Sequence, residues 1–294
     1  MSLPSPTPEE RVAGLPIWKG AVEPVPMTGG ITNTNFMVED AGRRHFVRIG
    51  SDIPVHGVMR FNELAAARAA QAAGITPAVL HAEPGVLVTE FIEGKTLGEE
   101  DFRDEAMLRR VVPLVRSCHV EVARRVSAPV LMFWPFQVVR HYAEVLRGGG
   151  SNYRERLPLL LEKADELELA VGPIAPVFGH NDLLPANFID DGSRLWLVDW
   201  DYAGFNSALF DLGGLAANCQ LELAHETFLL EQYFGSRPDA SLWRAYRAMK
   251  AVSALREAMW SMVSEIHSSI EFDFAAYTQE NLNRFAAAMA EFER

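Results

Sequence analysis

The segment HNDLLPANFIDDGSRLWLVDWDYAG, residues 180–204, decides the fold of this chain. The Asp-Gly pair at residues 191–192 stands between two apolar runs, which is a strong signal for the turn of a β-hairpin. Closing the hairpin at this turn brings Asn187 and Asp199 to its open end, beside the loop that carries Asp182. We therefore expect three oxygen-bearing side chains to converge at one place.

These three side chains suit metal-assisted phosphoryl transfer. Carboxylate and amide oxygens are ligands that Mg²⁺ accepts, and Mg²⁺ binds few protein carboxylates because waters and substrate phosphates complete its shell. Asn187 and Asp199 are the candidate metal ligands, and Asp182 remains available as a catalytic base. Asp182 precedes Asn187 by five residues and Asp199 follows it by twelve, an order and spacing typical of kinases. The alternative is a surface hairpin with solvated acids, which is common for an isolated Asp-Gly turn.

The sequence on either side of this segment predicts two lobes. After a short helix expected at 9–18, the N-terminal part has strand-like runs from Val22, an alanine-rich helix at 59–73 and two further strands ending near Phe91. Helical periodicity then predicts helices at 99–125, 135–147, 154–170 and from Asp211 onward, with the hairpin as the one β exception. The predicted fold class is α+β, with a small β-rich lobe over 1–91 and a larger, mainly helical lobe over 92–294.

A phosphate-binding loop is expected in the N-terminal lobe. The string GGITNTNF, residues 29–36, joins two glycines to small polar residues between strands, so its backbone N–H groups could contact a phosphate. A plain turn is the alternative interpretation. The candidate nucleotide-binding residues in this string are Thr32, Asn33, Thr34 and Asn35.

Nucleotide binding by a kinase also needs a cation and an acidic partner for it. Arg48, near the end of the strand-like FVRIG, could bind the α- and β-phosphates of a nucleotide. Glu63, on the alanine-rich helix, could pair with it. Arg48 would otherwise be an ordinary cation at the end of a strand.

The residues quoted so far, together with FDLGG (210–214) and WSMVSEIHSSIEF (260–272), resemble the choline/ethanolamine kinases within the aminoglycoside phosphotransferase-like kinases. The resemblance runs from about Pro26 to Phe285. HNDLLPANF and LVDWDYAG are highly specific for this superfamily, and arginine at position 48 is typical of the choline/ethanolamine branch. The resemblance implies a bilobal protein-kinase-like fold and an ATP- and Mg²⁺-dependent transfer of the γ-phosphoryl group to a hydroxyl of an amino alcohol.

The resemblance also implies roles for individual residues. It makes Asp182 the base, Asn187 and Asp199 the Mg²⁺ ligands, and Arg48 and Glu63 the pair that positions the phosphates. It also implies a hinge at Glu90 to Ile92, whose main-chain groups would bind adenine. His180 is then expected to shape the catalytic loop, and Asp211 to brace that loop.

The acceptor site is expected around a helix near 251–270. Its apolar stripe should face the core and consists of Val252, Leu255, Met259, Met262, Val263, Ile266 and Ile270. At about 100° per residue, Trp260 lies roughly 110° from the centre of this stripe. It shares that side with Ser253, Glu257, Ser264 and Glu271. An ammonium group could stack on the indole ring and pair with a nearby carboxylate, although packing of Trp260 against another helix is the alternative.

In the resemblance, Trp260 and Tyr277 match two aromatic residues of the choline-binding box. Glu257 stands in the place of a second tryptophan, and Asn218 replaces an acid that eukaryotic choline kinases use near the ammonium. These differences favour a primary ammonium such as ethanolamine over choline. The residues expected to contact the acceptor are Asp182, Asp201, Asn218, Glu257, Trp260 and Tyr277.

The composition is that of a globular protein and limits the partners. The 294 residues are 49% hydrophobic and 22% charged, and the net charge of −12 gives no source for binding nucleic acid or an anionic membrane. The two cysteines, at 118 and 219, have no metal-ligand spacing and suggest a reducing, cytoplasmic compartment. We expect a small cationic alcohol as the partner, with no membrane contact, and leave homo-oligomerisation open.

Two other functions stay open at this point. The acceptor could be another small alcohol, such as an aminoglycoside, thiamine or a sugar. The chain could also be a regulatory module that binds a nucleotide without catalysis, although such a module would usually have lost the base or a metal ligand.

Overall fold

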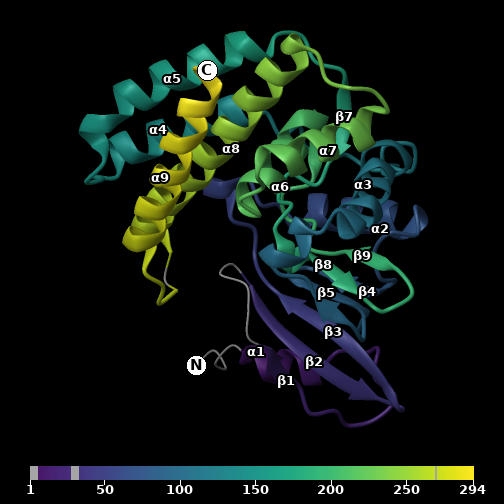
Figure 1. Cartoon of the computed structure of the whole chain (residues 1–294). Coiled ribbons are helices and arrows are strands. Elements are labelled where there is room, and N and C mark those ends of the chain that lie inside the picture. The colour runs from purple at the N-terminus through teal and green to yellow at the C-terminus, as the bar shows by residue number, and fades with distance from the viewer. Residues whose placement is uncertain (1–5, 28–32, 269) are drawn as a thin grey trace.

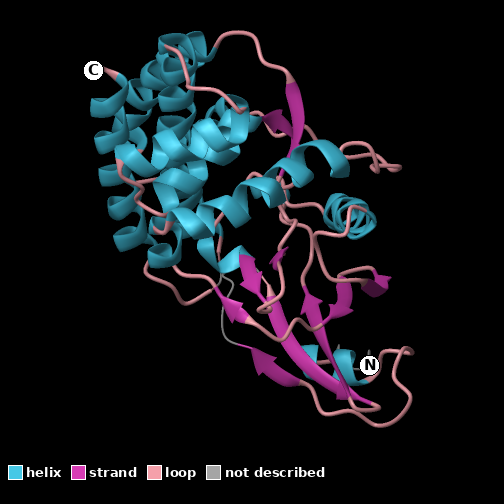
Figure 2. Cartoon of the chain, turned by 45° about the vertical axis from the view of Figure 1, so that its right-hand side comes forward, coloured by secondary structure: helices cyan, strands magenta, loops and turns pink. Residues whose placement is uncertain are grey.

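The computed structural model describes residues 6–27, 33–268 and 270–294. Strands gather in the lower lobe of the molecule and helices in the upper lobe (Figures 1 and 2). The chain therefore has the predicted bilobal, α+β architecture. Across the described residues, none of the helices is both long enough and apolar enough to cross a membrane.

The N-terminal lobe is an antiparallel sheet with the strand order β1-β2-β3-β5-β4. Its strands are Val25–Met27, Thr34–Asp40, Arg43–Ile49, Val86–Glu90 and Val79–Glu83, for β1, β2, β3, β5 and β4 respectively. The β2–β3 hairpin turns at Ala41 and Gly42, which have φ of 51° and 75° and so suit the twist of a tight hairpin. A small core of valines and Phe36 lies between this sheet and helix α1 (Pro8–Ala13).

Two short elements of the N-terminal half of the chain lie against the helical lobe. Helix α2 (Arg60–Ala72) buries its alanines in the core of the larger lobe, and Asn62 on this helix bonds Ala203 O and Leu131 N, each at 2.8 Å. The 3₁₀ turn η1 (Pro54–His56) precedes α2 and places His56 among helices of the C-terminal lobe. Both elements attach the small lobe to the large one.

Helices build most of the C-terminal lobe. In chain order they are η2 Glu99–Arg103, α3 Glu105–Ser117, η3 Cys118–Val122, α4 Pro135–Gly148, η4 Arg154–Arg156, α5 Leu157–Val171, η5 Pro185–Asn187, α6 Ala208–Asn218, α7 Leu223–Phe234, α8 Ala240–His267 and α9 Phe274–Phe292. One core joins α2, α3, α6, α7 and the hairpin, and a second joins α4, α5, α8 and α9. Gly213 of α6 is required for the contact with α8, because a Cβ there would lie 2.7 Å from Lys250 N.

The predicted catalytic hairpin is confirmed. Strand β8 (Phe188–Asp190) pairs with β9 (Leu195–Leu197), and β6 (Lys95–Thr96) completes this small sheet. Asp191 Oδ1 accepts from the backbone N–H groups of Ser193 and Arg194, which closes the turn. A separate pair, β7 (Pro176–Gly179) with β10 (Gly204–Ser207), was not predicted because neither run is long enough to show alternation.

Some predicted helices were wrong in extent. The helix expected over 9–18 ends at Ala13, where Gly14 follows. The helix expected over 99–125 is divided, because Asp104 accepts a hydrogen bond from Ala106 N and begins a new helix. The apolar stripe expected to 270 also ends early, because α8 ends at His267 and Ile270 is exposed.

The expectation that one side of α8, the side with Trp260, differs from the core was wrong. Helices α4, α5, α6 and α9 contact α8, so it is buried on nearly every side from Tyr246 to Ser264. Ser253, Trp260 and Ser264, expected on a side unlike the core, are all buried. A helix enclosed in this way has no solvent face, so an angle from the apolar stripe does not predict exposure.

Candidate active site

The hairpin brings Asn187 and Asp199 together beside Asp182. Val198 N donates to Asn187 O at 3.0 Å, which holds the two strand ends side by side, and Asn187 Nδ2 donates to Asp182 O at 2.8 Å. Asp199 has φ of 68°, a left-handed conformation that is uncommon outside glycine and that often occurs at functional sites. The convergence expected from the sequence is therefore present.

Buried hydrogen bonds fix the catalytic loop. The Asp211 carboxylate accepts from the backbone N–H groups of His180 at 2.8 Å and Asn181 at 2.7 Å. His180 Nε2 lies 2.9 Å from Val198 O, and His119 Nε2 lies 2.9 Å from Asp211 Oδ2. His180 and Asp211 thus occupy the loop-shaping and bracing positions expected of them.

A large cavity lies between the lobes and contains this hairpin. It has a volume of ≈ 710 Å³ and is lined by Asp182, Asn187 and Asp199, by the 90–92 segment, and by side chains of α8 and α9. Asp182 is 17% exposed to this space. Burial raises the pKa of Asp182 to about 7, while the guanidinium of Arg256 opposes that rise.

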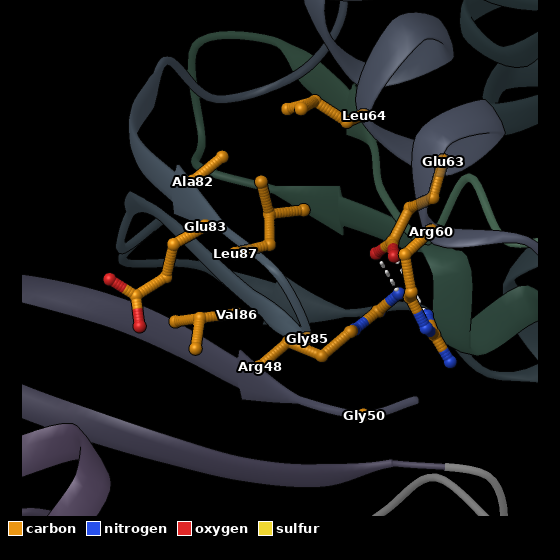
Figure 3. A pocket seen from close by; sticks show the side chains of 10 residues that line it. All are labelled: Arg48, Gly50, Arg60, Glu63, Leu64, Ala82, Glu83, Gly85, Val86 and Leu87. Atoms are coloured by element: carbon orange, nitrogen blue, oxygen red, sulfur yellow. Dashed lines mark hydrogen bonds and ion pairs between the residues drawn. The ribbon is translucent and has the colours of Figure 1, made fainter. Parts of the chain in front are cut away.

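At one end of the cavity, five charged side chains form a network that we call the nucleotide end: Arg48, Arg60, Glu63, Asp199 and Asp201. Arg48 Nη1 lies 2.7 Å from Glu63 Oε1, 3.0 Å from Asp199 Oδ1 and 2.9 Å from Asp201 Oδ1. Figure 3 views a smaller pocket that shares Arg48 and Glu63 with the cavity, and it shows Arg48, Arg60 and Glu63 converging from β3 and α2. The expected Arg48–Glu63 pair is present.

Arg60 was missed by the sequence analysis. Its Nη1 contacts Glu63 Oε2 at 2.7 Å and Asp201 Oδ1 at 2.8 Å, and its Nη2 donates to Asn33 Oδ1 at 2.7 Å. Burial alone would raise the pKa of Asp201, but Arg48 and Arg60 hold it below its usual value. The signal was the spacing of Arg60 and Glu63, three residues apart on one helix and therefore neighbours on its surface.

The other end of the cavity contains Asp182, Arg256, Glu257, Trp260 and Tyr277, which we call the acceptor end. Tyr277 Oη donates to Glu257 Oε1 at 2.9 Å, and Arg256 Nη1 lies 2.9 Å from Glu257 Oε2. Both carboxylate oxygens of Glu257 therefore have protein partners. Glu257 still lines the cavity, so its expected pairing with an ammonium group stays a prediction.

Several aromatic side chains pack around Trp260 at the acceptor end. The rings of Trp260 and Tyr277 are 6.4 Å apart in an edge-to-face arrangement. His56, from the small lobe, lies 5.3 Å from the Trp260 ring, and its nitrogens lie 3.1 Å from Tyr142 Oη and from Ser264 Oγ. Burial lowers the pKa of His56 to about 3, so the imidazole beside Trp260 is neutral.

Four predicted site residues lie elsewhere or differ from the expectation. Thr32 is outside the described residues. Thr34 is exposed and is not in the cavity lining, because alternation along β2 places its side chain opposite to that of Asn35, which lines the cavity. Asn218 donates to Leu183 O at 3.3 Å and is also outside the lining. Asp201 lines the cavity, but Arg48, Arg60 and Asn33 bind its carboxylate, so it braces the nucleotide end.

The remaining nucleotide candidates lie on the cavity or beside it. Asn33 donates to Asp201 Oδ2 at 3.1 Å. Glu90 and Ile92 line the cavity where β5 ends. Phe91 N donates to Arg44 O at 3.3 Å, so the carbonyl of Glu90 and the N–H of Ile92 are the main-chain groups expected to face a base.

The oxygen ligands at the hairpin fit Mg²⁺. Asp199 is 31% exposed toward the cavity, and the amide nitrogen of Asn187 is bonded to Asp182 O, which assigns its oxygen as the candidate ligand. Among the described residues, no group of three or more histidine, cysteine, aspartate or glutamate side chains could hold a metal alone. One carboxylate and one amide suit a cation whose other ligands are phosphates and water.

Arg256 was also missed by the sequence analysis. It is 4% exposed in the middle of α8, in the string VSALREAMWSMV, where Glu257 is the other charged residue. A charge in such a run is buried at a cost unless it is paired, so the sequence held a signal for a nearby carboxylate.

The bilobal fold, and the order of Asp182, Asn187 and Asp199 around one cavity, define the class of the protein as a kinase-like phosphotransferase. Comparisons with known proteins agree. The model of the choline/ethanolamine kinase family matches residues 25–228. Protein LicA of Haemophilus influenzae is 24% identical over 88% of this chain and 78% of its own length. Ethanolamine kinase 2 of Mus musculus is 25% identical over 87% and 73%.

A solved structure shares the fold as well. The choline/ethanolamine kinase family protein of Mesorhizobium loti has 29% identity and a TM-score of 0.76, covering 97% of this chain and 93% of its own. The chain belongs to the choline/ethanolamine kinase family, and it is a phosphotransferase with an alcohol group as acceptor.

Proposed function

We propose that the chain transfers the γ-phosphoryl group of ATP to the hydroxyl of choline or ethanolamine, with Mg²⁺ as the metal. The observation that carries this proposal is the single ≈ 710 Å³ cavity that joins the predicted base and metal ligands to an aromatic, carboxylate-bearing acceptor end. An amino alcohol has a hydroxyl and an ammonium close together, and at the acceptor end Asp182 matches the hydroxyl while Trp260 and Glu257 match the ammonium.

The residues at the centre of the cavity support in-line transfer. Asp182 would accept the proton of the attacking hydroxyl, which the burial-raised pKa of about 7 suits near neutral pH. Arg48 would orient the phosphates from the nucleotide end, and most of the rate enhancement would come from positioning and charge neutralisation.

ATP and Mg²⁺ are proposed on separate grounds. Glu90 and Ile92 line the cavity, and their main-chain groups would hold a purine; a structure of LicA that has a TM-score of 0.72 to this chain is a complex with AMP. Asn187 and Asp199 would hold Mg²⁺ together with the phosphates. When bound, the metal would neutralise charge that develops on the transferred group.

The other acceptors and the non-catalytic module remain testable alternatives. Against a non-catalytic module stands the presence of Asp182, Asn187 and Asp199 on one cavity. Against a neutral sugar stand the two carboxylates and the indole at the acceptor end, since these groups favour a cation.

The direct test is ADP release from ATP with choline, ethanolamine, thiamine and kanamycin, each with and without Mg²⁺. We expect turnover with choline or ethanolamine, and we expect it to need Mg²⁺. Asp199→Asn should abolish this turnover at ordinary Mg²⁺, whereas Asp165→Asn, at an exposed ion pair of α5, should not. Turnover of thiamine or kanamycin alone, or no turnover with any acceptor, would refute the proposal.

A further inference from the structure

Arg256 is a buried cation between the two carboxylates of the acceptor end. Its Nη2 lies 3.6 Å from Asp182 Oδ1, and its Nη1 lies 2.9 Å from Glu257 Oε2. The side chain is 4% exposed, whereas those of Asp182 and Glu257 are 17% and 16% exposed to the cavity. The arginine therefore lies behind the two acids and reaches both.

The surroundings fix the guanidinium in this place. Its Cζ lies 5.3 Å from the centre of the Tyr202 ring and 5.8 Å from that of Phe133, and Nη2 lies 3.5 Å from Asn181 O in the catalytic loop. The guanidinium is enclosed by aromatic rings and shielded from solvent. If it moved away from the two carboxylates, its charge would be buried without a partner, so this position is strongly favoured.

We propose that Arg256 is a positioning residue that cancels one of the two carboxylate charges, so that the acceptor end accepts alcohols with a single positive charge. Among the described residues that line this end, the charged groups are Asp182, Arg256 and Glu257. With Asp182 ionised, as its role of base requires, two carboxylates and one guanidinium leave a surplus of one negative charge. This inference rests on the proposed function, and it names the charge of the substrate as the property that the site selects.

The same contacts set the distance between the two functional parts of the substrate. Glu257 links Arg256 to Tyr277, and Trp260 follows one turn later on the same helix. Arg256 therefore ties the aromatic wall to Asp182 through a rigid, buried helix. An ammonium group bound against Trp260 and Tyr277 would therefore lie at a fixed distance from Asp182, which favours a short alcohol.

A purely structural ion pair is the competing account, because removal of a buried partner destabilises many proteins. The two accounts differ in one observable. Loss of a structural pair lowers activity with every acceptor alike, whereas loss of charge balance changes which acceptor is preferred. The charge of the acceptor is therefore the variable to test.

The experiment compares three small alcohols at neutral pH: ethylene glycol, ethanolamine and diaminopropanol, which carry zero, one and two positive charges. The wild-type chain should prefer ethanolamine in kcat/KM. Arg256→Met should move the preference toward diaminopropanol by about tenfold, because two carboxylates then remain without a cation. Arg256→Lys should keep the wild-type preference, and Arg244→Met, on an exposed part of the same helix, is the matched control.

A double variant restores the charge of the acceptor end. Arg256→Met combined with Glu257→Gln again leaves one negative charge and should return the preference to ethanolamine. Glu257→Gln alone should shift preference toward ethylene glycol, which tests the same balance even if Arg256→Met fails to fold. An unchanged order of preference in these variants, with activity lowered equally for all three alcohols, would overturn the proposal.

Calorimetry with ethylamine and propanediamine gives a readout that needs no turnover. Wild-type protein should bind the monoamine better, and Arg256→Met the diamine better. No turnover of either choline or ethanolamine by the wild-type chain would count against the proposed function. The amine binding would still decide on Arg256, because an unchanged amine preference in Arg256→Met would overturn its proposed role.

Discussion

The two ends of the cavity offset most of their carboxylate charge with arginines, but they do so by different constructions. The nucleotide end combines two guanidiniums with three carboxylates, from β3, α2 and the segment after β9. The acceptor end combines one guanidinium with two carboxylates, and Arg256, Glu257 and Trp260 come from one buried helix. Each end has one more carboxylate than guanidinium. Both ends are therefore prepared for a cation.

The difference lies in what holds each end in place. The nucleotide end exists only while the small lobe keeps its position over the hairpin, because Arg48 and Asp199 belong to different lobes. The acceptor end is built mainly on α8 and α9 of the large lobe, and His56 of η1 packs against its Trp260. Variants at the two ends should thus change the kinetics of different substrates.

Asp182 is the residue on which both ends depend, so its loss should have the largest effect. Asp182→Asn should lower kcat by about a thousandfold, because general-base catalysis is lost. The KM values for ATP and for the amino alcohol should change little, as should the melting temperature. Asp190→Asn, which removes a surface ion pair with Arg110 and can still accept from Gly192 N through its amide oxygen, should keep full activity. A thousandfold loss in the control, or normal kcat in Asp182→Asn, would contradict the assignment.

Arg60 should separate the nucleotide end from the acceptor end. Arg60→Gln removes bonds to Glu63, Asp201 and Asn33, and bonds to charged groups are worth about 1.5–3 kcal/mol each. We expect kcat/KM for ATP to fall about thirtyfold, while the KM for the amino alcohol stays the same. Arg68→Gln, on the exposed side of the same helix, is the control. An equal rise in both KM values would show that the two ends are not independent.

The pH profile should report on Asp182 alone. Burial raises the pKa of this carboxyl to about 7, and only the ionised form can accept a proton. Activity should therefore rise about tenfold per pH unit below pH 7 and level off above it. The measurement is kcat/KM for the amino alcohol against pH, and an acid limb centred near the ordinary value for aspartate would refute it.

Trp260 should give the smallest effect, confined to the acceptor end. Trp260→Leu removes the indole face, and a cation–π contact is worth about 0.5–2 kcal/mol. The KM for ethanolamine or choline should rise by about two- to thirtyfold, with no change in the KM for ATP. Trp243→Leu, near the start of the same helix, should leave both values unchanged. A change in the ATP value would place Trp260 in a different role.

The catalytic hairpin could be predicted because its determinants are local. The Asp-Gly turn fixes the register, and the register alone places Asn187 beside Asp199. The Arg48–Glu63 pair could be predicted from spacing and residue type. The sequence also held the information that Thr34 and Asn35 point to opposite faces of β2, since side chains alternate along a strand.

The rest depended on contacts between distant parts of the chain. Arg60 joins Asn33 and Asp201, which lie far from it in the sequence. The burial of Trp260 follows from helices that enclose α8, and Asn218 lies outside the cavity because α6 directs it toward Leu183. Periodicity describes one element at a time and contains no information on what surrounds that element.

The turn η1 makes the two lobes one folding unit. His56 leaves the small lobe, bonds Tyr142 and Ser264, and lies against Trp260 inside the helical core. Unfolding of the small lobe would remove these bonds and leave a void beside α8, so the large lobe would lose stability in the same step. Heating should therefore melt the chain in a single cooperative transition, and a fragment that lacks η1 should be unable to maintain the wall against which an ammonium would rest.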